Sequence, residues 1–356
     1  MVLTNPPFGA NVGENQKVGT TDETRVPLDD SAYEAEHEAR YGDPWLVSYG
    51  RIKAAARAQT KILDLYDIGK GKPNRATEIL FTERCINLLR PGGRMGIVLP
   101  NGNLNTPSLA WLRRWAEGRA KLLAVIALPE ETFRSAKATV TASVVYLRKF
   151  TTENQAEWED AWKDAHTTHD TSFDQQRDEL QQEYAERIIG SDDPVIVEIL
   201  DKLAAIGVQR TLPRWTLADP PAYPRGVGAT QTSRPIWEGA ATDAKTAAAL
   251  KRKYAVVWGK NKRSDSDAAF SCLKTRLRGV DAAHTAALWK TVRVAFDYPV
   301  FAAAPKTVGI TSAGDTGETV SNELSTVLDA YRVFERWIDA GSKEENRPDF
   351  CLPSTV

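Results

Sequence analysis

The stretch from residue 76 to residue 146 alternates helix-length amphipathic segments with short apolar runs, and this alternation constrains the fold most. Ala76 to Leu89 has apolar side chains at helical spacing, and Arg90-Pro91-Gly92-Gly93 ends that helix in a turn. Arg94 to Pro100 is a short apolar run, typical of a buried parallel strand. A second helix and two more strands are expected at Leu109 to Lys121, Leu122 to Leu128 and Val140 to Tyr146. This order predicts a layered α/β sheet.

The chain has 356 residues, enough for two domains or for one domain with a large insertion. Its 42% hydrophobic and 26% charged residues are typical of a soluble globular protein with a buried core. No run of about 18 apolar residues and no signal-peptide pattern is present, so we expect neither a membrane span nor export. The three cysteines are far apart, which argues against a zinc site or disulfides and favours the cytoplasm. The net charge of −1 gives no evidence for nucleic-acid binding.

The segment Asn5-Pro6-Pro7-Phe8 follows the apolar run Val2-Leu3-Thr4, which is typical of the end of a buried strand. The Asn5 side chain and the Pro6 backbone each offer a carbonyl oxygen that can accept a hydrogen bond from an exocyclic amine. The proline pair stiffens the loop, and Phe8 offers a flat face on which an extruded base can stack. Asn-Pro-Pro alone is more often a plain strand-ending turn. The preceding strand and the following aromatic favour a role in amine chemistry here.

Several stretches resemble the modification subunits of type I restriction systems and related adenine-N6 DNA methylases. Residues 2–9 resemble the catalytic motif of amino-methyltransferases, which methylases of other substrates share. The family pattern is also matched by residues 78–102, by Leu128-Pro129 with Thr132-Phe133, and by residues 140–147. Residues 298–311 and 322–334 resemble the closing hairpin strand and helix of the family. The resemblance covers residues 1–150 and 295–335 and is most specific for DNA adenine methylation.

The resemblance implies the C-terminal half of a Rossmann-like methyltransferase sheet, with the upstream strands missing and a mainly helical insertion. The implied domains are a partial catalytic domain, a helical insertion in the terminal hairpin, a closing strand and helix, and a tail, at residues 1–150, 151–292, 293–338 and 339–356. The implied reaction moves a methyl group from S-adenosylmethionine to a flipped adenine. Asn5, Pro6, Pro7 and Phe8 are the implied catalytic residues. Implied partners are double-stranded DNA with specificity and restriction subunits, or a complementing N-terminal methylase half.

The sequence departs from the family pattern at its start. The family places a Gly-rich loop and an acidic residue, which bind S-adenosylmethionine, before the motif, whereas only four residues precede Asn5. Gly226-Val227-Gly228 follows a proline-rich loop rather than a strand, so we interpret it as a flexible turn. We therefore expect the C-terminal part of a split or truncated methylase and assign no residue to the cofactor.

A basic stretch in the second half is a candidate for contact with DNA phosphates. It contains Lys251, Arg252, Lys253, Lys260, Lys262 and Arg263, with Trp258 among them. A solvated helix explains the same pattern slightly better. The acidic segment from Glu153 to Asp201 fits a solvated helical arm or a surface that docks a partner.

Three other polar groups have a functional and a structural interpretation. His166 and His169 are expected as surface histidines rather than metal ligands, because no further ligand cluster is near them. Asn101 either lines the site or forms a plain turn, and the sequence favours neither.

Two alternative functions stay open at this level. The first is methylation of RNA or protein, which Asn-Pro-Pro-aromatic permits. The second is a non-catalytic remnant or assembly module, which the missing upstream half favours. The recognised DNA sequence is expected to be encoded in a separate specificity subunit.

Overall fold

The computed structural model describes residues 1–19, 27–136, 140–219, 225–261 and 263–350. The chain divides into two compact units. The first comprises Met1–Glu153 and Tyr298–Val356, and the second comprises Asn154–Asp297. Among the described residues, no helix is both long and apolar enough to cross a membrane.

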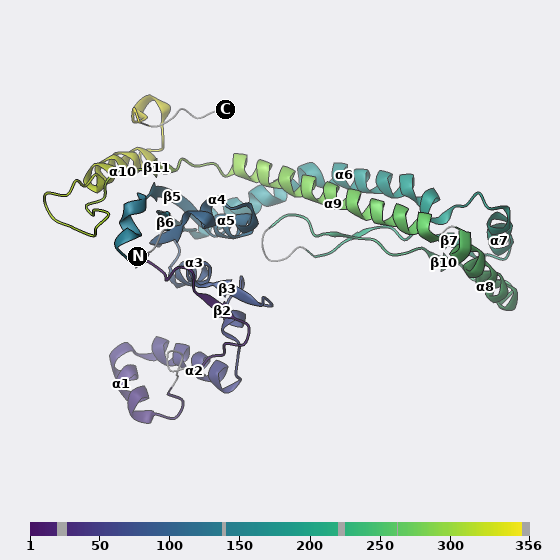
Figure 1. Cartoon of the computed structure of the whole chain (residues 1–356), viewed down its shortest axis with the longest axis horizontal. Coiled ribbons are helices and arrows are strands. Elements are labelled where there is room, and N and C mark those ends of the chain that lie inside the picture. Colours follow the sequence, from purple (N-terminus) through teal and green to yellow (C-terminus); the bar gives the residue numbers. More distant parts are fainter. Residues whose placement is uncertain (20–26, 137–139, 220–224, 262, 351–356) are drawn as a thin grey trace. The chain divides into compact units, whose positions relative to one another are not determined.

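A five-stranded sheet is the centre of the first unit (Figure 1). Its strands lie in the order β1 (Val2–Thr4), β4 (Arg94–Pro100), β6 (Ala142–Lys149), β5 (Ala120–Ala127) and β11 (Phe301–Ala303). β1 pairs with β4 in parallel, and β5 pairs with β11 in parallel. β6 lies between β4 and β5 and is antiparallel to both. Four strands therefore share one direction, which confirms the predicted α/β sheet.

The helix and strand that were predicted around the Gly92-Gly93 turn are confirmed. α3 (Thr77–Leu88) is helical as expected, and its residues Ile79, Leu80 and Ile86 are buried. Gly92 has a φ of +71°, a left-handed conformation that favours glycine, and β4 starts two residues later. α5 (Ala110–Glu117) is shorter than predicted, because the chain turns at Gly118 and β5 begins at Ala120.

The predicted pairing of the closing strand is wrong. We expected a hairpin between the Val140–Tyr146 strand and the strand that starts near Tyr298. Both edges of β6 are already paired, with β4 and with β5, so no hydrogen-bonding edge is left for β11. β11 pairs instead with β5. Residues 150–297 therefore follow the β5–β6 hairpin and do not lie at the tip of a hairpin formed by β6 and β11.

Val2–Thr4 forms a strand as predicted, but the prediction that this strand is buried is wrong. β1 is the outermost strand of the sheet and pairs with β4 alone among the described strands. With a neighbour on one side only, Leu3 is 69% exposed.

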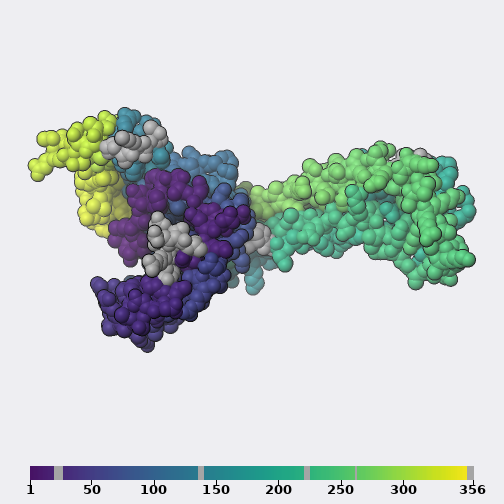
Figure 2. All heavy atoms as spheres, turned by 60° about the horizontal axis from the view of Figure 1, so that its bottom comes forward, coloured from purple at the N-terminus to yellow at the C-terminus, as the bar shows by residue number. Residues whose placement is uncertain are grey.

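Additional elements of the first unit surround the sheet. β2 (Asn11–Gly13) pairs antiparallel with β3 (Asn74–Ala76), which brings the segment after β1 to the start of α3. In the sequence, α1 (Ser31–Tyr41) and α2 (Asp43–Arg57) lie between β2 and β3. α4 (Asn101–Asn105) follows β4, the 3₁₀ helix η4 (Glu130–Ala136) follows β5, and α10 (Leu324–Asp339) follows β11. Dark purple residues near the N-terminus lie on the surface of this unit (Figure 2).

The second unit is mainly helical. Its long helices α6 (Thr152–Ile189) and α9 (Arg263–Ala295) lie side by side (Figures 1 and 2). They pack through buried residues that include Leu180, Ile188 and Leu273. The remaining elements are α7 (Pro194–Ala205), α8 (Ala244–Asn261) and the strand pairs β7 (Gln209–Thr211) with β10 (Ile236–Glu238) and β8 (Thr216–Leu217) with β9 (Thr230–Gln231).

Candidate functional site

The carboxyl ends of the parallel strands bring several polar and aromatic residues to one edge of the sheet. Asn5 directly follows β1, and Asn101 directly follows β4. η4 follows β5 by a few residues, and the antiparallel strand β6 begins at the same edge. Open α/β sheets bind their ligands outside the carboxyl ends of the strands. The motif that the sequence singled out therefore lies at the edge where a site is expected.

The four motif residues differ in exposure along the loop. Asn5 and Pro7 are exposed, Pro6 is buried and Phe8 is half-buried. A buried proline between two exposed residues anchors the loop, because its φ is fixed and its ring is packed. The ring of Phe8 lies 6.0 Å from that of Phe133 in an edge-to-face contact. Phe133 belongs to η4, so this contact joins the motif to the segment after β5.

Thr77, the first residue of α3, also holds the motif loop in place. Its Oγ1 donates a hydrogen bond of 2.7 Å to the carbonyl of Pro7. Its backbone N–H donates to the carbonyl of Ala10 over 3.0 Å. Sequence reasoning missed Thr77, because nothing in a threonine at a helix start shows that it bonds a residue 70 positions away.

Asn101 is held by the neighbouring strand. Its Oδ1 accepts a hydrogen bond of 2.8 Å from Ser143 Oγ, and its backbone N–H donates to the carbonyl of Thr141 over 2.9 Å. Asn101 is the first residue of α4 rather than part of a plain turn, and it follows β4 at the same edge of the sheet as Asn5.

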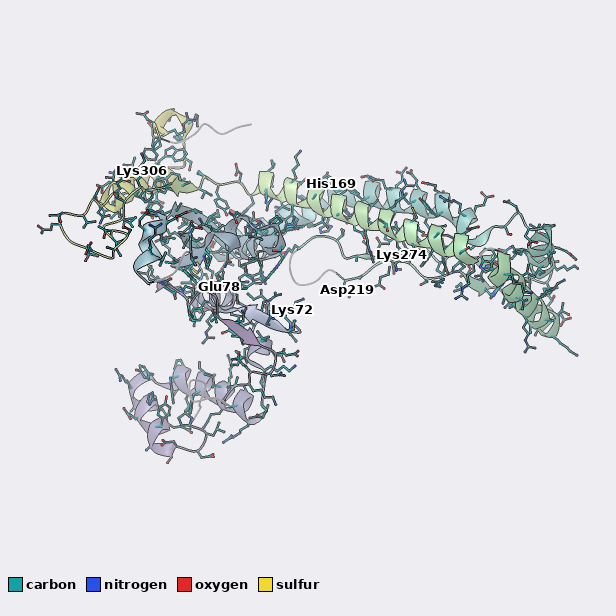
Figure 3. The ribbon with its side chains drawn as sticks, in the orientation of Figure 1. Lys72, Glu78, His169, Asp219, Lys274 and Lys306 are labelled. Carbon is teal, nitrogen blue, oxygen red and sulfur yellow. The ribbon has the colours of Figure 1, made fainter. Side chains whose placement is uncertain are left out.

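Glu78, labelled in Figure 3, is a buried acid in the first turn of α3 and follows Thr77 in the sequence. The residue is 8% exposed, and its Oε2 has no hydrogen-bond partner among the described residues. Burial raises the pKa of the Glu78 carboxyl, and a hydrogen bond from its own backbone N–H lowers it by less. Glu83, one turn later, accepts from the backbone N–H groups of Asp67 and Ile68 at 2.8 and 3.0 Å, so it has partners that Glu78 lacks.

The basic residues that were candidates for DNA contact lie in the second unit. Arg252, Lys253, Lys260 and Arg263 are exposed, and Lys251 is half-buried. Lys262 lies outside the described residues. Trp258 does not share the basic surface, because it is buried in a hydrophobic cluster with Ile196, Leu203 and Tyr254. Gly226-Val227-Gly228 lies in the same unit, between β8 and β9, away from any strand-to-helix junction.

The two histidines that were expected on the surface have partners on the long helices. His166 Nδ1 lies 3.0 Å from an oxygen of Asp170, and its side chain is 38% exposed. His169 Nε2 lies 2.8 Å from Thr291 Oγ1. Within the described residues, no group of three or more His, Cys, Asp or Glu is arranged to hold a metal ion.

The family model described as N-6 DNA methylase matches residues 41–191. The match covers less than half of the 356 residues, so it is a similarity of this part of the chain to the family. The match runs from the last residue of α1 to just beyond the end of α6. It contains Thr77, Glu78, Asn101 and Phe133, whereas Asn5–Phe8 precede it. No curated protein matches the chain.

Three solved structures are similar to parts of this chain. A protein of Listeria monocytogenes, described as a class I S-adenosylmethionine-dependent methyltransferase, is 20% identical over 25% of this chain and 27% of its own, with a TM-score of 0.23. A component of a type I restriction–modification system is 22% identical over 42% of this chain and 20% of its own, with a TM-score of 0.22. A type I modification subunit of Vibrio vulnificus is 18% identical over 41% of this chain and 22% of its own, with a TM-score of 0.21. The chain thus spans less than a third of the length of each.

Proposed function

We propose that the chain forms the amine-binding side of an S-adenosylmethionine-dependent DNA adenine-N6 methyltransferase of the restriction–modification type. One observation carries this proposal. Asn5-Pro6-Pro7-Phe8 directly follows a parallel strand at the carboxyl edge of the sheet, in a chain whose residues 41–191 match the N-6 DNA methylase family.

The adenine amine is a poor nucleophile, because its lone pair is delocalised into the ring. Two carbonyl acceptors at its hydrogens favour a more tetrahedral nitrogen and direct the lone pair away from the ring. Asn5 Oδ1 and the Pro6 carbonyl are those acceptors in this proposal. The buried Pro6 ring and the Thr77 bond to the Pro7 carbonyl keep them in place. Phe8, held by Phe133, is the surface on which the extruded base stacks.

The methyl donor of the family is S-adenosylmethionine, which supplies an electrophilic methyl group. At this edge of the sheet, no Gly-rich turn joins a strand to a helix within the described part of the chain. The residues present therefore fit the acceptor amine and not the donor, so no residue and no step is assigned to the donor. Double-stranded DNA and either specificity and restriction subunits or a complementing methylase half are the proposed partners.

A second candidate is a non-catalytic assembly module, and the outermost strand favours it. β1 has an unpaired edge among the described strands, and Leu3 on it is exposed. An unpaired strand edge is a template for pairing with another chain.

Methyl incorporation separates these functions. The chain, purified with the proteins encoded beside it, would be incubated with labelled S-adenosylmethionine and duplex DNA, RNA or protein. We expect label in duplex DNA, recovered as N6-methyladenine. Label in RNA or protein alone would contradict the DNA assignment. A stable complex that labels nothing would favour the assembly module.

A further inference from the structure

Arg210 in the second unit is enclosed by aromatic rings. It lies on β7 directly opposite Trp237 of β10. Its guanidinium carbon is 4.9 Å from the ring centroid of Trp237 and 5.0 Å from that of Tyr254. Trp258 lies 5.9 Å away and stacks on Tyr254. Three cation–π contacts hold the guanidinium in one orientation, which lowers the entropy that it loses when it binds a ligand.

Arg210 has no acidic partner among the described residues. Its Nε is buried without a hydrogen bond, and burial lowers the pKa of the guanidinium. Other arginines of this unit are paired with carboxylates: Arg177 with Asp281, Arg214 with Asp178, Arg225 with Glu159 and Arg234 with Asp267. Arg187, Arg252 and Arg278 also have no carboxylate partner in the part of the chain that the structure describes, but they are exposed, whereas Arg210 is half-buried. A partly buried cation without a counter-charge is unfavourable, so Arg210 indicates that a neutralising anion comes from another molecule.

Lys251 lies over the same aromatic ring as Arg210. Its Nζ is 5.6 Å from the centroid of Trp237, so two cations share one ring. Arg210 also lines an open cavity of about 510 Å³, whose lining includes Arg214 and Asp178, which pair with each other. Arginine and lysine are side chains that proteins use for phosphate oxygens.

We propose that Arg210, with Lys251, is a binding site for a backbone phosphate of DNA. Exposed Arg252 and Lys253 follow on α8 and extend the positive charge. The choice of DNA as the source of the phosphate rests on the proposed function. The site reads no bases, so it contributes affinity that is independent of sequence and sensitive to salt.

The test is the affinity of the full chain for a labelled duplex of arbitrary sequence, measured by fluorescence anisotropy from 50 to 200 mM salt. Loss of one phosphate contact lowers the slope of log K against log salt by about 0.9, which corresponds to about eightfold in affinity at 0.1 M salt. Arg210→Gln is expected to show both changes. Lys251→Gln is expected to change both in the same direction without opening the aromatic cluster.

Arg234→Gln is the matched control. Arg234 also lies over an aromatic ring, that of Phe270 at 5.6 Å, but Asp267 already neutralises it. We expect the affinity of Arg234→Gln for the duplex to be within about twofold of that of the parent. Unchanged affinity and slope in folded Arg210→Gln would overturn the site, and so would an equal loss in Arg234→Gln. If Arg210→Gln does not fold, Lys251→Gln decides by the same criteria.

The outcome is independent of the proposed chemistry. Selective weakening by Arg210→Gln in a chain that never methylates DNA would support the phosphate site and contradict the methyltransferase. Loss of binding to a companion protein with unchanged DNA affinity would contradict the phosphate site.

Discussion

Thr77 joins two segments that are far apart in sequence, since its Oγ1 bonds the Pro7 carbonyl over 2.7 Å. We predict that Thr77→Val frees the loop and lowers the rate of methyl transfer about 10- to 100-fold, because small displacements of positioned groups have effects of this size. The free energy of unfolding of this variant should be about 1 kcal/mol lower than that of the parent. Steady-state kinetics should place the loss in kcat rather than KM, and Thr77→Ser should restore it. A loss of stability with an unchanged kcat would show that Thr77 is only structural.

Glu78 gives a pH-dependent prediction. Burial raises the pKa of this carboxyl above its unfolded value, so its favourable contribution is complete below about pH 4.3 and is lost as pH rises through the raised pKa. Glu78→Gln cannot ionise. We therefore expect equal melting temperatures for the parent and the variant near pH 4 and a higher one for the variant at pH 8.

Glu83→Gln is the control for this comparison. Glu83 accepts two backbone N–H groups, and an amide has one oxygen to offer them, so this variant should be less stable than the parent at pH 8. A Glu78→Gln variant that is less stable than the parent at pH 8 would show that the carboxylate has a stabilising partner.

At the residue scale, site residues that are adjacent in the sequence could be predicted. Residues that contact the site only in the folded chain could not. Asn5–Phe8 stand together, so their acceptors and aromatic ring can be identified without a structure. Thr77 and Phe133 contact the motif only because β2 pairs with β3 and because β5 ends at the same edge as β1. Glu78 was missed because an acidic residue in the first helical turn is usually solvated.

At the scale of elements, the turn between α3 and β4 depends on two glycines. A Cβ on Gly93 would lie 2.7 Å from the carbonyl oxygen of Arg90, which is backbone and cannot rotate away. We predict that Gly93→Ala lowers the free energy of unfolding by about 1–3 kcal/mol, measured by urea denaturation.

Gly50 is the matched control, since it lies in α2 and a Cβ there meets nothing within 4 Å. Gly50→Ala should raise stability by up to about 1 kcal/mol through helix propensity. Equal effects of the two substitutions would contradict the steric account of the turn.

The local sequence pattern predicted where the helices and strands lie. The order of the strands in the sheet depends on pairing between residues far apart in the sequence. The apolar run of β4 and the amphipathic spacing of α3 are local properties, so both were found with limits close to those observed. The position of β11 depends on which sheet edge is free. That edge is fixed by the insertion of β6 between β4 and β5, and no spacing in the sequence records it.

At the scale of the whole molecule, each compact unit has its own core, and the second unit contains a buried polar cluster. Arg177 is fully buried and bonds Asp281, Asp174 and His284. We predict that Arg177→Leu destabilises the second unit by about 3–5 kcal/mol, because it leaves Asp281 buried without its cation.

Hydrogen exchange locates this effect. Amides of residues 154–297 should exchange faster in the Arg177→Leu variant, and those of the sheet in the first unit should keep their protection. Equally faster exchange in both units would show that they unfold as one cooperative body.

The central claim is that Asn5 holds the adenine amine, and the N6-methyladenine content of DNA tests it most directly. The chain and its companion proteins would be expressed in a host without adenine methylation. The nucleosides of the host DNA would then be quantified by mass spectrometry. We predict N6-methyladenine with the parent, a loss of at least about 100-fold in Asn5→Ala, and parental levels in Asn11→Ala, the control at an exposed asparagine of β2. N6-methyladenine at the parental level in Asn5→Ala would contradict the account.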